Sequence, residues 1–420
     1  MSAIFSLAWK SLLNRRFTVL LTLFAIALSV VLLLGVETVR RDAKLSFANT
    51  IAGTDLIVGA RSGSIQLLLY SVFRIGHATN NISWRSYQDI AALPQVAWTI
   101  PIMLGDSHRG YAVMGTSADY FQQYRFARDR SLHFAEGGPF VDLYDAVIGA
   151  EVARALDYTL GQEIIVAHGM GATSFAKHDD KPFRVAGILE HTGTPVDRTV
   201  HISLEGFEAM HVDWRGGAPI PGMTISADEA RAMDLTPRSI TAFLVGLESR
   251  RDVFRLQRAV NDYRQEPLLA ILPGVALQQL WDLMRVAETA LLMISVCVVV
   301  AGLIGMLAVL LASLESRRRE LAILRSVGAR PRHIMALLVS EAALLALLGA
   351  VLGMLALYGL LALTQGWVEA RFGLYLALSA PGIPELRIVA LVVGAGCLAG
   401  LVPAWRAYRY ALVDGMTLRN

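Results

Sequence analysis

The stretch "SLESRRRELAILRSVGARPRHI", residues 313–334, places six arginines within 22 residues, between two long uncharged runs. The whole chain of 420 residues has a formal net charge of only +3, so this is its strongest concentration of positive charge. Such a cluster is typical either of a nucleic-acid-binding patch or of a short cytoplasmic loop between two membrane spans. The composition of the remaining sequence decides between these two interpretations.

Charged residues are scarce in this chain, which is 55% hydrophobic and 17% charged, whereas a soluble domain has roughly 25% charged residues. A helix that crosses a bilayer needs about 20 apolar residues. Four segments meet or approach that length and are predicted to be transmembrane helices: 17–36, 289–314, 335–368 (uncharged from 342) and 388–405. A buried core helix is the alternative, but it would be shorter, about 10 to 14 residues, and would carry a polar stripe.

The positions of Lys and Arg near the span ends predict the orientation of the chain. Basic residues precede the first span, fill the loop between the second and third spans, and follow the fourth span. We therefore expect residues 1–16, 315–334 and 406–420 to be cytoplasmic, and residues 37–288 and 369–387 to lie on the other side. A cleaved signal peptide is the alternative for the N-terminus, but its apolar core would be about 7 to 15 residues long rather than 20. Residues 1–16 are expected to form an amphipathic segment on the inner membrane surface.

Residues 37–288, about 250 in number, are sufficient for one large domain or two subdomains. The segment contains no cysteine, because Cys297 and Cys397 both fall within predicted spans. Alternation and turn residues predict strands at 97–104, 111–117, 146–150, 162–168, 183–190 and 199–204, and helices at 83–93, 150–158, 248–264 and 276–292. The predicted fold is a membrane protein with four transmembrane α-helices and a large α+β extracytoplasmic domain, expected to comprise two subdomains, inserted between the first and second spans.

Several stretches of the sequence are similar to one known family. "RRRELAILRSVGARPRHI" (317–334) resembles the cytoplasmic loop of the MacB/FtsX-type permeases of ABC transporters, and "VPAWRAYRYALVDGM" (402–416) resembles the end of their fourth span. "YAVMGTSADYF", "AVIGAEVARALDYTLGQEIIVA" and "FRVAGILEHTGTPVDRTVHISL" resemble the exported core domain of MacB-like permeases. The resemblance covers nearly the whole chain and implies a cell inner-membrane protein with a periplasmic domain.

This resemblance implies that the arginine-rich loop contacts a separate ABC ATPase. Residues 315–326 can form three helical turns that end at a glycine in the left-handed conformation. The residues expected to couple the two proteins are Arg317, Arg318, Arg319, Glu320, Leu321, Leu324, Arg325 and Gly328. An apolar ridge of Leu321, Leu324 and Val327 or Gly328 would dock on the ATPase. The alternative is a loop whose arginines only fix the topology.

The chain contains no G-x-x-x-x-G-K-[ST] motif, so no P-loop for binding ATP phosphates is expected in it. ATP and Mg²⁺ are expected in the partner ATPase, and no catalytic residue or cofactor is predicted here, in contrast to MacB itself, whose ATPase is fused. The predicted function is conversion of ATP binding and hydrolysis into movement of the periplasmic domain (mechanotransmission), for export, efflux or the handling of lipids or lipoproteins. The alternative is a transmembrane regulator that controls a periplasmic hydrolase or binding protein without transporting anything, as FtsX does.

The family resemblance also implies a dimer, because ABC transporters work with two permease halves and two ATPases. Two G-x-x-x-G pairs, Gly349 with Gly353 and Gly396 with Gly400, are predicted to allow close helix packing, although glycine is common in spans. A periplasmic or outer-membrane partner protein and membrane lipid are further expected partners, and nucleic acid is not.

Histidines gather in the exported region. His168, His178, His191, His201 and His211 fall within 44 residues, near Asp179, Asp180 and Asp213. Imidazole and carboxylate together suit zinc or copper. Because the spacings fit neither a single helix nor a hairpin, the sequence favours solvated loop histidines, and it predicts no metal site.

Overall fold

The computed structural model describes residues 16–50, 52–127, 129–169, 178–215, 218–220, 225–316, 323, 325–372 and 380–409. The chain divides into two compact units. The helical unit comprises Met1–Asp42, Arg285–Gly366 and Leu376–Asn420, and the α+β unit comprises Ala43–Met284 and Trp367–Tyr375. Each unit is described by itself below.

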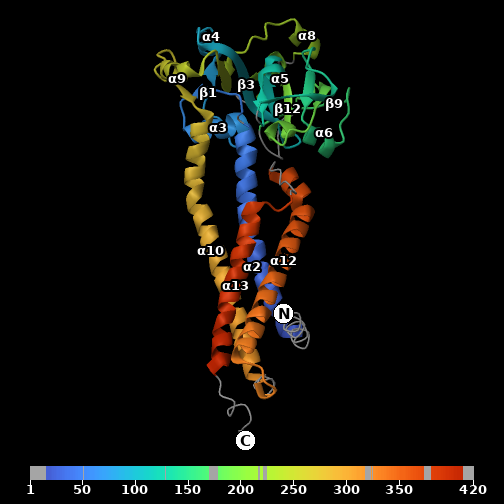
Figure 1. The fold of residues 1–420 in the computed structure, drawn as a ribbon. Helices are drawn as coiled ribbons and strands as arrows, with labels where there is room; N and C mark the ends of the chain where they lie inside the picture. The colour runs from blue at the N-terminus through green and yellow to red at the C-terminus, as the bar shows by residue number, and fades with distance from the viewer. Residues whose placement is uncertain are drawn as a thin grey trace. The chain divides into compact units, whose positions relative to one another are not determined.

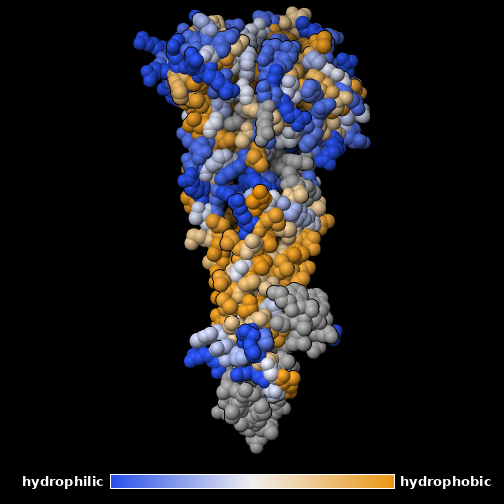
Figure 2. Space-filling model, in the orientation of Figure 1, coloured by the Kyte–Doolittle hydropathy of each residue, from blue (hydrophilic) through white to orange (hydrophobic). Residues whose placement is uncertain are grey.

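Four long helices contribute to the helical unit: α2 (Arg16–Thr50), α10 (Pro273–Ser316), α12 (Pro331–Phe372) and α13 (Ile383–Arg409). By length and composition, each can cross a membrane. On the face shown in Figure 2, hydrophobic residues form a continuous band along these helices, whose course is drawn in Figure 1. The four apolar helices predicted from the sequence are therefore confirmed.

Each helix is longer than the span predicted for it. The limits predicted from the sequence lie where charged residues begin, so they give the length of the apolar segment that fits the hydrocarbon layer. The helix itself continues beyond them. Beyond the apolar part of α2, the helix continues through charged residues that pair with one another: Arg40 lies 2.7 Å from Glu37 on the same helix and 3.7 Å from Glu288 on α10. Arg41 pairs with Glu385 of α13. These ion pairs connect three helices just outside their apolar segments.

The two glycine pairs lie at close contacts between helices of the same chain. A Cβ atom on Gly353 would stand 2.6 Å from the carbonyl oxygen of Ala27, and one on Gly349 would stand 2.7 Å from Cγ2 of Ile26. Both glycines therefore bring α12 against α2. A Cβ on Gly396 would stand 2.5 Å from Cβ of Ala346, and one on Gly400 would stand 2.4 Å from Cβ of Ala342. The second pair brings α13 against α12.

In the described part of the α+β unit, eleven strands form one sheet in the order β17-β1-β16-β3-β4-β12-β8-β11-β7, with β10 paired to β3 and β9 to β11. The pairs β4/β12 and β8/β11 are parallel, and the others are antiparallel. The strands are β1 (Leu56–Ala60), β3 (Val96–His108), β4 (Tyr111–Thr116), β7 (Phe134–Gly137), β8 (Asp145–Ile148), β9 (Glu163–Ile164), β10 (Ala167–His168), β11 (Phe183–Leu189), β12 (Thr199–Ser203), β16 (Ala242–Leu247) and β17 (Leu268–Ile271).

Short elements surround this sheet. The helices are α3 (Ser64–Phe73), α4 (Trp84–Ala91), α5 (Asp119–Gln123), α6 (Ala150–Leu156), α7 (Leu204–Ala209), α8 (Ala227–Arg231) and α9 (Val253–Asn261), with 3₁₀ turns η1 (Pro195–Arg198) and η2 (Arg250–Asp252). Three small ladders pair β2 (Ile82–Ser83) with β15 (Ser239–Ile240), β5 (Arg125–Phe126) with β6 (Arg130–Ser131), and β13 (Trp214–Arg215) with β14 (Ala218–Pro219).

The sheet is covered on both faces. Strand β1 is buried along its whole length, and its alternate residues enter different hydrophobic clusters: Leu56 and Val58 belong to one cluster and Ile57 to the other. The same alternation separates Phe243 from Leu244 on β16. The sequence of a strand that is buried on both faces is a continuous apolar run, without alternation of apolar and polar residues. The core of the unit therefore has two layers, one on each face.

With one exception, the strands and helices expected within residues 83–204 and 248–292 are confirmed by the structure, including the N-cap of α4, where the Ser83 hydroxyl accepts a hydrogen bond from the backbone N–H of Ser86. The exception is the strand expected at 162–168, which is divided into β9 and β10, paired with β11 and β3 respectively. The sequence patterns did not predict the helices α3, α5, α7 and α8 or, in the large sheet, the strands β1, β7, β16 and β17. The strands β1, β16 and β17 are short apolar runs without alternation. Their identity depends on pairing between distant segments, which local patterns do not report.

The expectation of solvated loop histidines is wrong for several of the five. His178 and His201 are fully buried, and the side chain of His211 is only 20% exposed. Burial, reinforced by the nearby charge of His211, lowers the pKa of His178 to about 4, and burial beside Arg74 lowers the pKa of His201 to about 3. Both imidazoles are therefore neutral at pH 7. The burial follows from the sheet, whose strands and connections carry these residues inward.

Replacing Gly353 by Ala is expected to lower the free energy of unfolding by about 1 to 3 kcal/mol, because the new methyl group would collide with the backbone of α2. Gly359 is a matched control on the same helix, since a Cβ there meets nothing within 4 Å among the described residues. Gly359→Ala should leave stability unchanged or raise it slightly. Thermal unfolding of both variants in detergent measures the difference, and equal effects would contradict the packing described here.

Candidate functional site

The candidate site is the connection between α10 and α12. Six of the predicted coupling residues lie outside the described part of the chain: Arg317, Arg318, Arg319, Glu320, Leu321 and Leu324. The structure describes the residues that flank them, including Arg325 and Gly328. Gly328 adopts φ +100°, the left-handed conformation predicted for it. The N–H of Val327 donates to the carbonyl of Ile323 (3.1 Å) and that of Gly328 to the carbonyl of Arg325 (3.1 Å), so a helical turn ends here.

The chain re-enters the bundle directly after this turn. α12 begins at Pro331, a residue favoured in the first turn of a helix because its missing N–H would have no partner there. The N–H of Arg330 donates to Nδ1 of His333 (3.3 Å), and the N–H of His333 donates to the carbonyl of Arg330 (2.8 Å). Reciprocal hydrogen bonds of this kind hold the start of the helix. The exit from the connection is therefore a short, hydrogen-bonded corner.

The ends of three helices pack together beneath this corner. Leu314 of α10, Ile334 and Leu338 of α12, and Ala404 and Ala407 of α13 form a buried hydrophobic cluster. A force applied to the connection would therefore reach three helices, since all three contribute to one packed cluster.

Two apolar side chains on the connection face outward. The exposed fraction is 63% for Ile323 and 83% for Val327, and the two residues are four positions apart. Residues at this spacing lie on the same face of a helix. The sequence analysis included Val327 in its apolar ridge but omitted Ile323. The i, i+4 spacing of these two β-branched residues was the signal that could have identified Ile323.

A pocket of about 440 Å³ lies at the end of α13, lined by Val402, Trp405, Arg406 and Arg409. The guanidinium carbon of Arg409 stands 5.0 Å from the centre of the Trp405 ring, within the range of a cation–π contact. Trp405 is nevertheless 60% exposed. This end of the helical unit thus presents apolar, aromatic and positively charged side chains to its surroundings, which is typical of the end of a membrane span at the interface.

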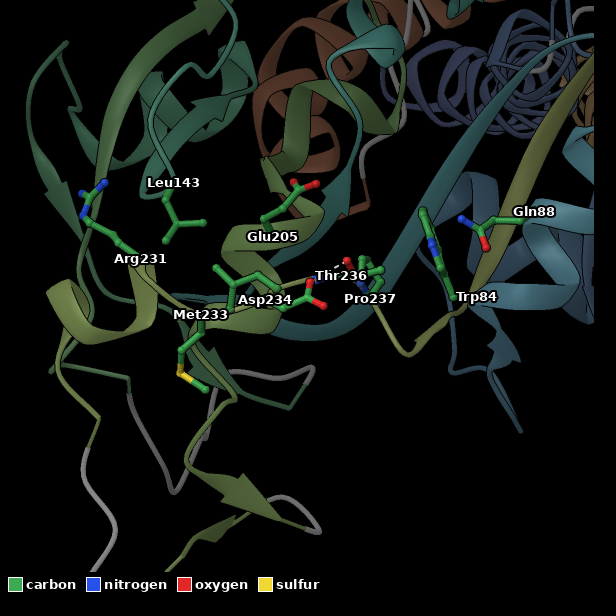
Figure 3. A pocket seen from close by; sticks show the side chains of 10 residues that line it. Trp84, Gln88, Leu143, Glu205, Arg231, Met233, Asp234, Thr236 and Pro237 are labelled. Carbon is green, nitrogen blue, oxygen red and sulfur yellow. Dashed lines mark hydrogen bonds between the residues drawn. The ribbon is translucent and has the colours of Figure 1, made fainter.

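A second pocket, of about 590 Å³, belongs to the α+β unit. In Figure 3, Trp84 and Gln88 stand at one end, Arg231 and Leu143 at the other, and Asp234 and Thr236 between them. Two of its charged groups are held by protein contacts. Arg231 donates to both carboxylate oxygens of Asp142 (2.7 and 2.8 Å), which lowers the pKa of Asp142, and Asp234 accepts from the Thr236 backbone N–H and hydroxyl. We therefore place the candidate site at the α10–α12 connection.

Comparison with protein families agrees with this division of the chain. The MacB-like periplasmic core domain model matches residues 19–243, and the FtsX-like permease C-terminal model matches residues 292–412. The chain belongs to the MacB/FtsX-type family of ABC transporter permeases. The α10–α12 connection lies inside the FtsX-like match, and ten of the eleven strands of the large sheet begin inside the MacB-like match.

Individual relatives are distant in sequence. The chain is 22% identical to the macrolide export ATP-binding/permease protein MacB of Wolinella succinogenes, over 96% of this chain and 59% of that protein. It is 23% identical to the pyoverdine export ATP-binding/permease protein PvdT of Pseudomonas aeruginosa, over 95% of this chain and 56% of that protein. The solved periplasmic region of MacB from Actinobacillus actinomycetemcomitans matches 56% of this chain and 98% of that chain, with 11% identity and a TM-score of 0.34. The chain thus spans less than two thirds of the curated relatives.

The exposure of the apolar pair on the connection predicts a contrast in stability. Ile323→Ser and Val327→Ser should change the free energy of unfolding of the isolated chain by no more than about 0.5 kcal/mol, because both side chains are exposed. Leu314→Ala and Leu338→Ala should each cost about 2 to 5 kcal/mol, because they leave a cavity in the cluster of three helices. Thermal unfolding of the four variants in detergent tests both expectations. A large loss of stability in Val327→Ser would mean that the Val327 side chain is packed against the protein.

Proposed function

We propose that this chain is the permease subunit of an ABC exporter and converts ATP binding and hydrolysis by a separate ATPase into movement of its periplasmic domain. In this proposal the α+β unit is the periplasmic domain, inserted between the first and second spans. Residues 1–16 and 406–420 are cytoplasmic, and two copies of the chain work with two copies of the ATPase.

The observation that carries the proposal is the continuity of α10. This helix has 44 residues, which corresponds to about 66 Å at 1.5 Å per residue, about twice the thickness of the hydrocarbon layer. Near its start, Ala276 and Leu277 are buried in the core of the α+β unit. Its apolar middle supplies one candidate span, and its last residues adjoin the candidate coupling site. One helix therefore runs from the core of the α+β unit to the residues next to the candidate coupling site.

α2 provides a second connection of the same kind. After its apolar span, the helix continues to Thr50, whose carbonyl accepts a hydrogen bond from the hydroxyl of Tyr124 (2.7 Å) within the α+β unit. Phe47 of the same helix packs against Phe73, with ring centres 4.2 Å apart. Because two helices enter the core of the α+β unit, a rotation or shift of the helices is expected to move that unit as a body.

Polar side chains within the helices favour movement over conduction. The hydroxyls of Thr22, Ser29 and Ser295 each donate to the carbonyl four residues earlier on their own helix, at 2.8, 2.8 and 2.9 Å. Channels and carriers instead turn polar groups toward a solute pathway. In the described part of the helices, these hydroxyls are already engaged, which supports a permease that acts through mechanical displacement.

The names of the relatives support export as the direction of action, since MacB proteins are described as macrolide exporters and PvdT proteins as pyoverdine exporters. We accordingly propose that the moving domain acts on a substrate in the periplasm, a small molecule or a lipid-linked one. Regulation of a periplasmic hydrolase is the competing outcome. In that case the domain would still move in response to ATP, but no transported substrate would be required.

The coupling role is tested by replacing Arg317, Arg318 and Arg319 together with Ala in a complex with the partner ATPase in lipid. We expect the ATPase to bind at least about tenfold more weakly, because charged groups that pair across an interface are lost. Replacing Lys10, Arg15 and Arg16 with Ala is the matched control, since it removes three positive charges from the same predicted side of the membrane. Copurification and ATP hydrolysis are the measurements. If the two triple variants copurify with the ATPase and support ATP hydrolysis equally well, the arginines determine only the topology of the chain.

A further inference from the structure

Three imidazoles and one carboxylate converge within the α+β unit. Asp106, His168, His178 and His211 each place one potential ligand atom within 4.8 Å of the others. We propose that these four residues form a binding site for a divalent transition-metal ion, with Zn²⁺ as the preferred ion. This proposal replaces the sequence-based prediction that the exported histidines bind no metal, and it does not depend on the proposed function.

Strand pairing brings the first two residues together. Asp106 lies on β3 at a register irregularity, and His168 on β10 is its direct cross-strand partner. Nδ1 of His168 stands 2.9 Å from Oδ1 of Asp106. Two backbone-directed hydrogen bonds fix the neighbouring residues, from the N–H of Gly169 to the carbonyl of Gly105 (3.1 Å) and from the hydroxyl of Ser107 to the carbonyl of Gly169 (2.6 Å). The pair is therefore held by the sheet itself.

Two further segments supply the other imidazoles. His211 follows α7, and its Nε2 stands 3.4 Å from Oδ2 of Asp106. His178 precedes β11, and its backbone N–H donates to the carbonyl of Val166 (2.9 Å), which places its ring beside that of His211, with ring centres 4.8 Å apart. Four separate stretches of the chain thus meet at one point, which explains why the spacing in the sequence gave no ligand motif.

His178 provides the strongest sign that a ligand belongs here. Its side chain is fully buried, yet within the described residues neither Nδ1 nor Nε2 has a hydrogen-bond partner. Buried polar atoms are almost always paired, because an unpaired one loses its bonds to water without replacement. Asp106 is also fully buried, so its negative charge lacks the solvation that water would provide. A cation between these groups would accept the nitrogen lone pair and neutralise the carboxylate.

Two other acidic residues near the histidines, Asp180 and Asp213, have a different role. Nζ of the fully buried Lys181 lies 2.6 Å from Asp180 and 3.0 Å from both oxygens of Asp213. These contacts balance the charge of the buried ammonium group. Asp180 and Asp213 are thereby engaged by Lys181, while Asp106 faces the imidazoles.

The donor set and its surroundings fit zinc. Zn²⁺ takes neutral imidazole nitrogens and carboxylate oxygens at about 2.0 to 2.2 Å in a tetrahedron, so its ligand atoms stand about 3.4 Å apart. Nε2 of His211 already stands 3.4 Å from Oδ2 of Asp106. All four ligand atoms lie within 4.8 Å of one another, so small side-chain movements would be needed to close the shell around an ion. Nδ1 of His211 lies 2.9 Å from the carbonyl of Phe207, so a proton on Nδ1 would be donated there and Nε2 would face the cluster, an orientation typical of metal-ligating histidines. Trp214 packs on His178, with ring centres 4.2 Å apart, and forms an apolar wall.

The geometry also indicates what the metal would do. Four protein ligands complete a tetrahedral shell, as in structural zinc sites, whereas catalytic sites keep one position open. The ion would join β3, β10, the segment before β11 and the end of α7. The side chain of His168 is 37% exposed, so an ion can reach the cluster from that side. The expected effect is a more stable periplasmic domain when the metal is bound.

The test uses the full-length chain in detergent, purified without a polyhistidine tag and treated with a chelator. Titration with Co²⁺ should give one equivalent per chain with the visible absorption bands of tetrahedral cobalt, and Zn²⁺ should displace it. Zn²⁺ should also raise the unfolding temperature of the wild-type protein. If the wild-type protein binds neither ion at micromolar concentrations, the proposal is overturned.

Three variants assign the binding to these residues. His178→Gln and His168→Ala should each weaken Co²⁺ binding at least about a hundredfold, because each removes a ligand. His201→Gln is the matched control, a fully buried histidine on β12 outside the cluster, and should bind as the wild type does. His178 is buried, so the partly exposed His168 decides the question if His178→Gln does not fold. Unchanged binding in His168→Ala would also overturn the proposal.

Discussion

Hydrocarbon cannot form hydrogen bonds, and this constraint governs the helical half of the molecule. Every polar group that enters the bilayer has to be satisfied within the protein, so the chain crosses it as helices, and hydroxyls such as those of Ser29 and Ser295 bond to their own backbone. The hydrophobic effect gives little attraction between helices in lipid, so close packing must replace it. Gly353 and Gly400 provide that packing, and Arg41 and Glu385 pair beyond the apolar segment.

The α+β unit follows a different rule, because it folds in water and has no disulfide to assist it: the two cysteines, Cys297 and Cys397, lie in the helices. Its stability depends on a sheet buried on both faces, where strands such as β1 have no exposed residue. In a core of this kind, polar residues on the strands and on the segments next to them are also buried. Lys181 is stabilised there by two carboxylates, whereas His178 lacks a partner among the described residues. That contrast is the basis for the proposed metal site.

Features that depend on local sequence were predictable. The four apolar runs, the left-handed Gly328, the N-cap at Ser83 and the strands on either side of Gly110 each arise from neighbouring residues, and the structure contains all of them. Features that depend on distant pairing were not. β1 lies between β16 and β17, which follow it by well over a hundred residues, and Asp106 meets His168 only because β10 pairs with β3. Of the coupling site, the position of the turn could be predicted, and the spacing of Ile323 and Val327 could have identified the exposed apolar pair. The cluster formed by the ends of three helices could not be predicted, since it depends on where distant segments meet.

The proposed movement of the periplasmic domains in response to ATP can be measured directly. Val141 is 94% exposed in the α+β unit, so a spin label at Val141→Cys, with Cys297 and Cys397 replaced by Ala, should report the distance between the two copies in a complex with the ATPase. Pulsed electron spin resonance in lipid nanodiscs would compare the nucleotide-free complex with one trapped by ATP and vanadate. If ATP moves the periplasmic domains, the two states should give different distance distributions. The same distribution in both states, in a complex that hydrolyses ATP, would contradict the proposed movement.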